Sequence, residues 1–362
     1  MKIGITTHFH RTKNYGGVLQ AYALPKFLNG VMDGCAAQIR FGTFGQDAHA
    51  LFFPRVYEKF EEFYSLIPQI EQQIGYEDEL SILEDKLDVF LTGSDQVWNP
   101  SWFYPQFYLQ GINKRKIAYA ASVGIGTLTR EEQKIIPLIQ KIDYVSVREK
   151  TAERLIQKYS GKRVTTVVDP VLLLSAKQWW ELQNLEFHKS NYAFAHFLGT
   201  GMAGRNESIR LAKGMNISLI HIPYLSQFYN NFDELWGDYK YEEAGPCEFL
   251  GLIANSNVVF TDSFHAMVFS IIFQKQFLVF ERKDSTIKSM NSRIYDFLKD
   301  LDLLDRIVKE GDSGVERVLT KVIDYDKVTK VIEGKKLHSL GFLQRAFKET
   351  ELESPLSKYT FG

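Results

Sequence analysis

The sequence contains few cysteines and no long hydrophobic run. Cys35 and Cys247 are the only two cysteines among 362 residues, and they fit neither a disulfide framework nor a metal-binding motif. This indicates ordinary thiols in a reducing compartment. The most apolar stretch, residues 266–273, is far shorter than the ~20 residues that cross a bilayer, and residues 1–10 lack the apolar segment of a signal peptide. We therefore expect a cytoplasmic protein, and association with the inner face of the membrane stays open.

The chain also lacks an excess of charge of one sign. It has 43 Lys and Arg residues against 44 Asp and Glu residues, a net charge of −1. Nucleic-acid-binding proteins usually have a clear basic excess, so we expect no nucleic-acid partner. An anionic ligand would have to be held by local positive charge. Apolar residues are abundant instead: hydrophobic residues make up 45% and aromatic residues 14% of the chain, which indicates a globular protein with rings available for stacking.

Short β-branched runs alternate with helix-like segments along most of the chain. The predicted strands are residues 2–6, 87–91, 117–122, 144–147, 164–168, 192–198, 218–222, 258–261 and 276–280. The predicted helices are residues 15–28, 149–159, 207–215, 248–254, 266–273, 293–299 and 341–350. Such alternation predicts βαβ units with parallel sheets.

We therefore predict an α/β protein with two Rossmann-like, doubly wound domains that face a cleft. The N-terminal domain is predicted over residues 1–178 and the C-terminal domain over residues 188–335, and the helical segment 336–362 is expected to pack back on the core. In such sheets ligands bind at the carboxyl ends of the strands. Because domains on either side of a cleft commonly move, we also expect the two halves to close around a ligand.

Two glycines follow the first predicted strand, in the sequence Asn14–Tyr15–Gly16–Gly17. Paired glycines let a ligand approach the backbone at a helix N-terminus, where free N–H groups attract anions. The alternative is a tight turn in which Asn14 caps the helix. The spacing alone does not decide between the two.

A second turn, which contains Ser94, Asp95 and Trp98, follows the predicted strand 87–91. Ser94 or Asp95 could cap the next helix, and taken alone the pattern favours this. The alternative is that both side chains hydrogen-bond sugar hydroxyls while Trp98 provides a stacking surface.

Arg148 and His265 are stronger candidates. Arg148 follows the predicted strand 144–147, where a guanidinium can hold a carboxylate or phosphate with two parallel hydrogen bonds. The alternative is a surface ion pair with Glu149 or Glu153, but an arginine at a helix start opposes the helix dipole, which favours function. His265 lies in the first turn of a predicted helix, where it could exchange protons with a ligand or simply bond a backbone carbonyl.

Arg293 and four histidines are weaker candidates, and each is more often structural when taken alone. The histidines are His8, His10, His196 and His221. The sequence has no HExxH motif, P-loop, GxSxG elbow or Cys/His cluster, so we expect no metal site.

Taken together, these segments resemble the polysaccharide pyruvyl transferase family. The resemblance is carried by Asn14-Tyr-Gly-Gly-Val-Leu-Gln-Ala-Tyr-Ala-Leu24, Thr92-Gly-Ser-Asp-Gln-Val-Trp-Asn99, Ser146-Val-Arg-Glu149, Val168-Asp-Pro170, Gly245-Pro-Cys-Glu-Phe-Leu250, Thr261-Asp-Ser-Phe-His265 and Asn291-Ser-Arg-Ile294. It implies a fold similar to GT-B glycosyltransferases. It also implies transfer of a pyruvyl group from phosphoenolpyruvate to a sugar of a bacterial surface polysaccharide or its lipid-linked precursor, as a cyclic ketal and without a cofactor.

The resemblance maps the family's arginine and histidine onto Arg148 and His265. Many members have an arginine two residues before that histidine, and this chain has Ser263 there. The resulting assignments fall into three groups: catalytic, His265, Arg148 and Asp95; donor-binding, Arg148, Arg293, Ser263, Gly16, Gly17 and Asn14; acceptor-binding, Tyr15, Ser94 and Trp98.

Two alternatives stay open. The first is a GT-B-type glycosyltransferase that uses a nucleotide-sugar. The second is a non-catalytic glycan-binding or assembly protein with the same fold, and Ser263 in place of an arginine is the feature that supports it.

Overall fold

Two parallel sheets form the centres of the two halves of the molecule. The computed structural model describes residues 1–9, 12–41, 53–75, 79–184, 190–224, 233, 236–282 and 290–347. The N-terminal sheet has the order β3-β2-β1-β4-β5-β6-β7, with β1 (Lys2–Thr6), β2 (Cys35–Phe41), β3 (Gln69–Ile74), β4 (Val89–Thr92), β5 (Arg115–Ala121), β6 (Tyr144–Val147) and β7 (Val164–Thr166). The C-terminal sheet has the order β10-β9-β8-β11-β12-β13, with β8 (Tyr192–His196), β9 (Ser218–His221), β10 (Tyr239–Lys240), β11 (Val258–Thr261), β12 (Gln276–Phe280) and β13 (Ile307–Val308). Each half is therefore Rossmann-like, and the predicted α/β class is confirmed.

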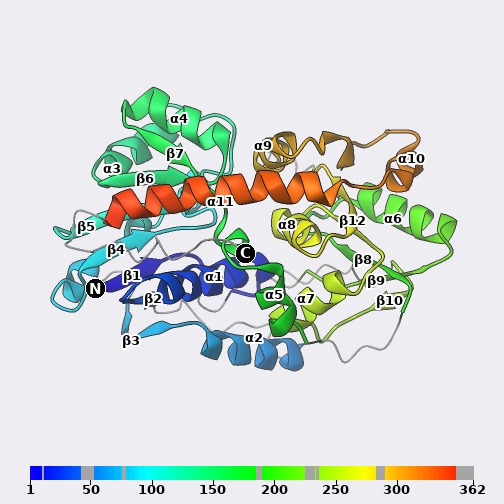
Figure 1. Cartoon of the computed structure of the whole chain (residues 1–362), viewed down its shortest axis with the longest axis horizontal. Helices are drawn as coiled ribbons and strands as arrows, with labels where there is room; N and C mark the ends of the chain where they lie inside the picture. The colour runs from blue at the N-terminus through cyan, green and yellow to red at the C-terminus, as the bar shows by residue number, and fades with distance from the viewer. Residues whose placement is uncertain are drawn as a thin grey trace.

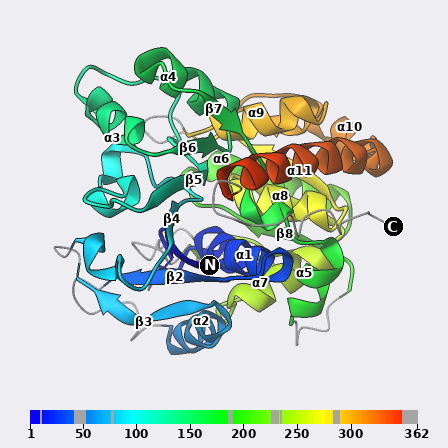
Figure 2. The same ribbon diagram turned by 60° about the vertical axis from the view of Figure 1, so that its left-hand side comes forward.

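Helices cover both faces of each sheet. They are α1 (Tyr15–Val31), α2 (Pro54–Leu66), α3 (Ile136–Gln140), α4 (Lys150–Ser160), α5 (Ala176–Leu182), α6 (Met202–Gly214), α7 (Pro246–Ala254), α8 (Phe264–Ile272), α9 (Ser292–Asp300), α10 (Val315–Thr320) and α11 (Tyr325–Phe347). Figure 1 shows α11 running across both halves, and Figure 2 shows the same helix from another side. Its residue Ser339 accepts a hydrogen bond from the N–H of Val168, and Phe342 packs against Tyr119. The end of the chain that is described therefore returns to the N-terminal half.

The central strands are buried on both faces, which is why they read as short apolar runs in the sequence. All four residues of β4 and all four of β11 are buried. The predicted strands 2–6, 144–147, 258–261 and 276–280 are confirmed at both ends. The edge strand β3 was not predicted, because its sequence QIEQQI is polar and its side chains are mostly exposed or half-buried.

The two halves share one hydrophobic core. A single cluster of buried side chains includes residues from α1 and α2 in the N-terminal half and from α7 and α8 in the C-terminal half. At its centre the Tyr15 ring stacks on Phe249 at 4.7 Å, and Trp179 meets the edge of Phe269 at 5.0 Å. A wide hinge motion would expose this apolar surface to water. The structure therefore disfavours the domain closure that the two-domain pattern suggested.

Candidate active site

The N-terminus of α1 lies directly against His265 of the C-terminal half. The Asn14 side chain caps the helix by accepting a hydrogen bond from the N–H of Gly17 at 3.2 Å, so the capping interpretation of this turn is correct. A Cβ added at Gly16 would lie 2.0 Å from Nδ1 of His265. Glycine is thus required at position 16 because the imidazole occupies the space of a side chain.

Replacing Gly16 by alanine should disturb His265 without unfolding the protein. The new methyl group must displace the imidazole, and a misplacement of about 1 Å at a reacting group costs on the order of 10²-fold in rate. Gly30→Ala in the same helix is the control, since a Cβ there meets no atom within 4 Å. Turnover and melting temperature of both variants measure the effect. Equal turnover in Gly16→Ala and wild type would contradict the close contact.

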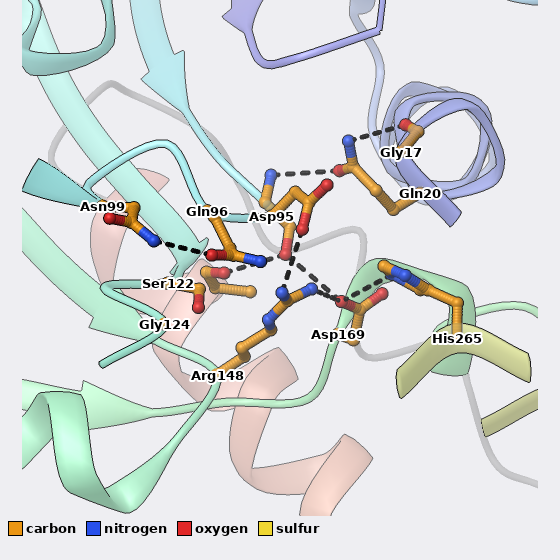
Figure 3. Close-up of polar contacts among 12 residues, drawn as sticks. Gly17, Gln20, Asp95, Gln96, Asn99, Ser122, Gly124, Arg148, Asp169 and His265 are labelled. Atoms are coloured by element: carbon orange, nitrogen blue, oxygen red, sulfur yellow. Dashed lines mark hydrogen bonds and ion pairs between the residues drawn. The ribbon is translucent and has the colours of Figure 1, made fainter. Parts of the chain in front are cut away.

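Arg148 lies at the centre of a buried polar cluster formed at the carboxyl ends of the N-terminal strands (Figure 3). Its Nη1 donates to Oδ2 of Asp169 at 2.7 Å, and its Nη2 donates to Oδ1 of Asp95 at 3.0 Å. Its Nε lies 3.8 Å from Oε2 of Glu149 and has no hydrogen-bond partner. The side chain is only 1% exposed, which excludes the alternative of a surface ion pair. Because two protein carboxylates already hold the guanidinium, a donor would meet only its remaining N–H groups.

Asp169 connects the two halves across this cluster. Its Oδ2 accepts hydrogen bonds from Arg148 and from Oγ of Ser94, and it lies 3.5 Å from Nε2 of His265. Burial alone would raise the pKa of Asp169, but its interactions with His265 and with the Arg148 guanidinium outweigh it and hold that pKa well below its usual range. The carboxylate is therefore ionised and can orient both basic side chains. Sequence reasoning missed Asp169 as a site residue, although its place after the predicted strand 164–168 was a signal.

Asp95 faces the same cluster from the turn after β4. Burial alone would raise the pKa of Asp95, but Arg148, and to a smaller extent His265 and Arg293, keep it below its usual value. This makes Asp95 a weak base near neutral pH, so the structure favours an anchoring role for it. His8 lies nearby, and burial lowers its pKa to about 4, so His8 is neutral and brings no charge.

Arg293 is a buried cation without an anionic partner. It is 6% exposed, and within the described part of the chain no carboxylate forms an ion pair with it and its Nε has no hydrogen-bond partner. Burial and the positive charge of Arg148 lower the pKa of Arg293 to about 9. The Phe264 ring lies 5.7 Å from the guanidinium carbon of Arg293 and 4.8 Å from that of Arg148. Phe264 therefore holds both cations beside the cluster.

The residues predicted to bind the acceptor lie inside the protein. Trp98 is fully buried, and its indole N–H donates to the carbonyl of Phe107 at 3.0 Å. Tyr15 is 6% exposed, stacks on Phe249 and donates its hydroxyl to the carbonyl of Ala244. Neither ring has a free face for a sugar, because both pack in the hydrophobic core. Their placement corrects the acceptor-binding assignment.

The two serines predicted to bind substrate, Ser94 and Ser263, also make structural contacts. Ser94 is fully buried and donates its hydroxyl to the carbonyl of Ala120 and to Asp169. Ser263 caps α8 by accepting a hydrogen bond from the N–H of Ala266 at 3.4 Å. Ser94 thus supports Asp169 instead of facing an acceptor, and Ser263 places His265 in the first turn of the helix.

Of the weaker histidine candidates, His221 and His196 lie in the C-terminal half in structural surroundings. His221 bonds the carbonyl of Asp233 through Nε2 at 2.7 Å and stacks on Trp236, and burial lowers its pKa. Burial also lowers the pKa of His196, to about 4. His10 lies outside the described residues. Across the ranges that the structure describes, no three His, Cys, Asp or Glu side chains are grouped so as to hold a metal ion.

One cavity is lined by residues of the polar cluster, and another lies beside a glycine-rich segment. The first, about 360 Å³ in volume, has Arg148, Asp169 and Phe264 in its wall and is closed on the other side by α9 and α11. The second, about 410 Å³, lies beside the segment Gly199-Thr-Gly-Met-Ala-Gly204, which joins β8 to α6 and includes the first turn of that helix. This segment has GxGxxG spacing, which sequence reasoning overlooked. No helix in the described segments has both the length and the apolar character needed to cross a membrane.

Comparisons with known proteins identify a family and a fold. The model of the polysaccharide pyruvyl transferase family matches residues 14–285. No curated protein sequence gave a significant match.

Solved structures show the fold. The N-terminal domain of a Candida albicans trehalose-6-phosphate phosphatase is 9% identical, with a TM-score of 0.57 over 96% of this chain and 97% of that chain. The trehalose-6-phosphate synthase OtsA is 10% identical, with a TM-score of 0.55 over 98% of this chain and 100% of that one. A putative UDP-N-acetylglucosamine 2-epimerase from Listeria monocytogenes is 14% identical, with a TM-score of 0.53 over 98% of both chains. At these identities the likeness concerns the GT-B fold alone.

Proposed function

The chain belongs to the polysaccharide pyruvyl transferase family, and from this premise we propose that it transfers a pyruvyl group from phosphoenolpyruvate to a sugar. The acceptor in this proposal is a sugar of a bacterial surface polysaccharide or its lipid-linked precursor, and the product is a pyruvate ketal. Family membership makes the protein a transferase enzyme. The donor, the acceptor and the roles of the residues are the proposed part.

The observation that carries the donor assignment is the unpaired buried guanidinium of Arg293. Burying a charge is costly unless an opposite charge compensates it, and within the described residues Arg293 has no ion pair, only the longer-range attraction of Asp95 and Glu149. Phosphoenolpyruvate has a carboxylate and a phosphate, and it would supply the missing negative charge. Nε2 of His8 is a further buried nitrogen without a hydrogen-bond partner. The arginine that position 263 lacks is thus replaced by one on α9.

The chemistry of the proposal requires one proton to reach carbon and one to leave with phosphate. Protonation of the methylene carbon of phosphoenolpyruvate gives an oxocarbenium-like centre, which nearby negative groups stabilise. One sugar hydroxyl adds to this centre, the C–O bond to phosphate breaks, and a second hydroxyl closes the ketal. The two hydroxyls lose two protons, of which one balances the new methyl group and the other the phosphate.

His265 is the proposed proton-transfer group. Its Nε2 faces the Asp169 carboxylate, whereas its Nδ1 faces the N-terminus of α1 at Gly16. This arrangement, in which a carboxylate orients an imidazole, is the usual way to fix which nitrogen exchanges the proton. Arg148 holds Asp169 and Asp95 in place and offers its remaining N–H groups to the donor.

Arg293→Met tests the donor assignment, because a binding arginine and a structural arginine respond differently. We expect the affinity for phosphoenolpyruvate, measured by titration calorimetry, to fall by about 10- to 100-fold, since one charge-assisted interaction is worth about 1.5–3 kcal/mol. We expect the melting temperature to stay the same or to rise, since a buried cation without a partner is removed.

The matched control is Arg306→Met. Arg306 is equally buried, but its Nη1 donates to Gln276 at 2.6 Å and its Nη2 donates to the carbonyl of Lys321. That variant should lose stability and keep its donor affinity. Unchanged affinity in Arg293→Met would refute the assignment. Tight binding of phosphoenolpyruvate without phosphate release, on any acceptor tested, would support the non-catalytic alternative.

A nucleotide-sugar is the second candidate donor, favoured by the GxGxxG loop at the start of α6. Such a loop at a helix N-terminus can bind a diphosphate. The adjoining cavity, however, is lined by the acidic residues Glu207, Asp262, Glu281, Glu310 and Asp312 against the basic residues Arg282 and Lys309. This excess of negative charge opposes a diphosphate. Titration with UDP and with UDP-sugars distinguishes this candidate from phosphoenolpyruvate.

A further inference from the structure

The cavity between Arg148 and α11 joins the protein surface to the polar cluster. Arg148, Val168 and Asp169 form its buried floor, and Gly334, His338 and Lys150 lie exposed at its mouth. Its volume of about 360 Å³ falls in the range of small-molecule sites. A molecule in this cavity would touch the same Arg148 and Asp169 side chains that hold His265 and Asp95.

The charges of the lining suit an uncharged ligand better than a polyanion. Three acidic residues, Asp169, Asp296 and Asp300, face three basic residues, Arg148, Lys150 and Lys335. The formal charges therefore cancel, whereas Arg293 forms no ion pair within the described residues. A donor with up to three negative charges would be stabilised more by the positive charge of Arg293 than by this neutral lining. The cavity instead offers carboxylates and ammonium groups that can hydrogen-bond hydroxyls, next to two phenylalanine rings.

The two rings are Phe264 and Phe297, whose centroids lie 5.9 Å apart. Aromatic rings provide a flat apolar surface on which the C–H face of a sugar can lie. Phe264 also contacts the Arg148 guanidinium at 4.8 Å. Phe264 is only 4% exposed and closes the floor of the cavity, so the half-buried Phe297 ring is the apolar surface available to a sugar.

Gly334 is a glycine in the interior of α11 that no protein contact explains. A Cβ at this position would meet no atom within 4 Å, and glycine weakens a helix interior relative to alanine. The space left by the missing side chain belongs to the cavity. Gly334 therefore widens the mouth at a cost to the helix.

The two walls of the cavity also differ in origin. Arg148, Asp169 and Phe264 lie within residues 14–285, which match the family model, whereas α9 and α11 lie beyond that match. The second wall therefore comes from the part of the chain beyond residue 285, where α9 begins within the segment Asn291-Ser-Arg-Ile294.

We propose that this cavity is the acceptor subsite and binds one uncharged pyranose ring between Phe264, Phe297 and α11. The proposal rests on the proposed function, because it identifies where the sugar of that reaction is held. Specificity for the acceptor then comes from α9 and α11, and the chemistry comes from the cluster on the floor.

Filling the cavity from its mouth tests the proposal. The probes are the methyl glycosides of glucose, galactose, mannose, N-acetylglucosamine and N-acetylmannosamine, with binding measured by saturation-transfer NMR. We expect wild-type protein to bind at least one of them, and Gly334→Trp, whose indole occupies the cavity, to weaken that binding at least tenfold. Gly334→Ala is the control: it should keep the binding and raise the melting temperature. The melting temperature of Gly334→Trp shows whether that variant is folded.

Titration of the same variants with phosphoenolpyruvate separates this proposal from the donor assignment. Unchanged donor affinity in Gly334→Trp is expected. Loss of donor affinity in that variant would place the donor in the cavity and overturn the proposal. Equal glycoside binding in folded Gly334→Trp, or no binding of any probe by wild-type protein, would also overturn it. Failure of wild-type protein to bind phosphoenolpyruvate, with glycoside binding blocked as expected, would refute the donor and leave the subsite intact.

Discussion

Replacing His265 by glutamine should lower turnover by about 10²- to 10⁴-fold, the usual contribution of a general acid or base. Glutamine cannot exchange a proton, but its amide can still donate to Asp169, whose Oδ2 lies 3.5 Å from Nε2 of the histidine. The buried carboxylate therefore keeps a partner, and we expect the fold and most of the donor affinity to survive. Phosphate release and melting temperature, measured on one preparation, give the two quantities.

His221→Gln is the control for a histidine with a structural role. His221 is 1% exposed, bonds the carbonyl of Asp233 and stacks on Trp236, away from the polar cluster. Its replacement should lower the melting temperature and leave the turnover of folded protein unchanged. A stable His265→Gln protein with wild-type turnover would shift the proton transfer to another group.

The sequence predicts the parts of the fold that are apolar and periodic. Strands β6, β11 and β12 were predicted at both ends, because central parallel strands are buried on both faces and appear as continuous apolar runs. Helix α11 was predicted only near its end. Its first part is polar, and most of its buried residues lie between Ser339 and Phe347. The helical spacing of apolar residues is therefore clear only near the end of the helix.

The candidate site was partly predictable for a related reason. Asp95 and Arg148 follow predicted strands of the N-terminal sheet, whose carboxyl ends meet at one edge, and His265 follows a predicted strand of the C-terminal sheet. The structure brings these three residues together. Asp169 and Phe264 were missed as site residues. Their roles depend on contacts between the two halves, and the distances between side chains far apart in the sequence cannot be predicted from residue order.

The predicted acceptor-binding residues differ from those that line a cavity in the structure. Trp98 and Tyr15 lie next to polar site residues in the sequence, and this nearness suggested stacking on a sugar. In the structure Trp98 packs in a hydrophobic core, whereas Asp95 faces Arg148. A suitable residue type that is next to a site residue in the sequence is therefore weaker evidence for ligand binding than a side chain that lines a cavity.

Arg148→Lys should cause a large loss of both stability and turnover although the charge is kept. Arg148 bridges Asp169 and Asp95 with two hydrogen bonds of 2.7 and 3.0 Å from different nitrogens. A lysine has a single nitrogen and no planar fork, so it cannot hold both carboxylates in this geometry. Losing one hydrogen bond to a buried charge should lower the free energy of unfolding by about 1.5–3 kcal/mol, as measured by urea denaturation. The released carboxylate would no longer be positioned, and turnover should fall on the order of 10²-fold.

The control and the double variant distinguish this role from simple loss of a positive charge. Arg154→Lys, on the exposed side of α4, should change neither quantity, because its guanidinium bonds only Thr151 at 3.0 Å. Asp169→Asn should also lower turnover, and the double variant Arg148→Lys/Asp169→Asn should lose much less than the sum of the two single losses, since both changes break the same contact. Additive losses would show that Arg148 and Asp169 act independently. A stable and active Arg148→Lys protein would mean that the bridge between the two carboxylates is not what organises the site.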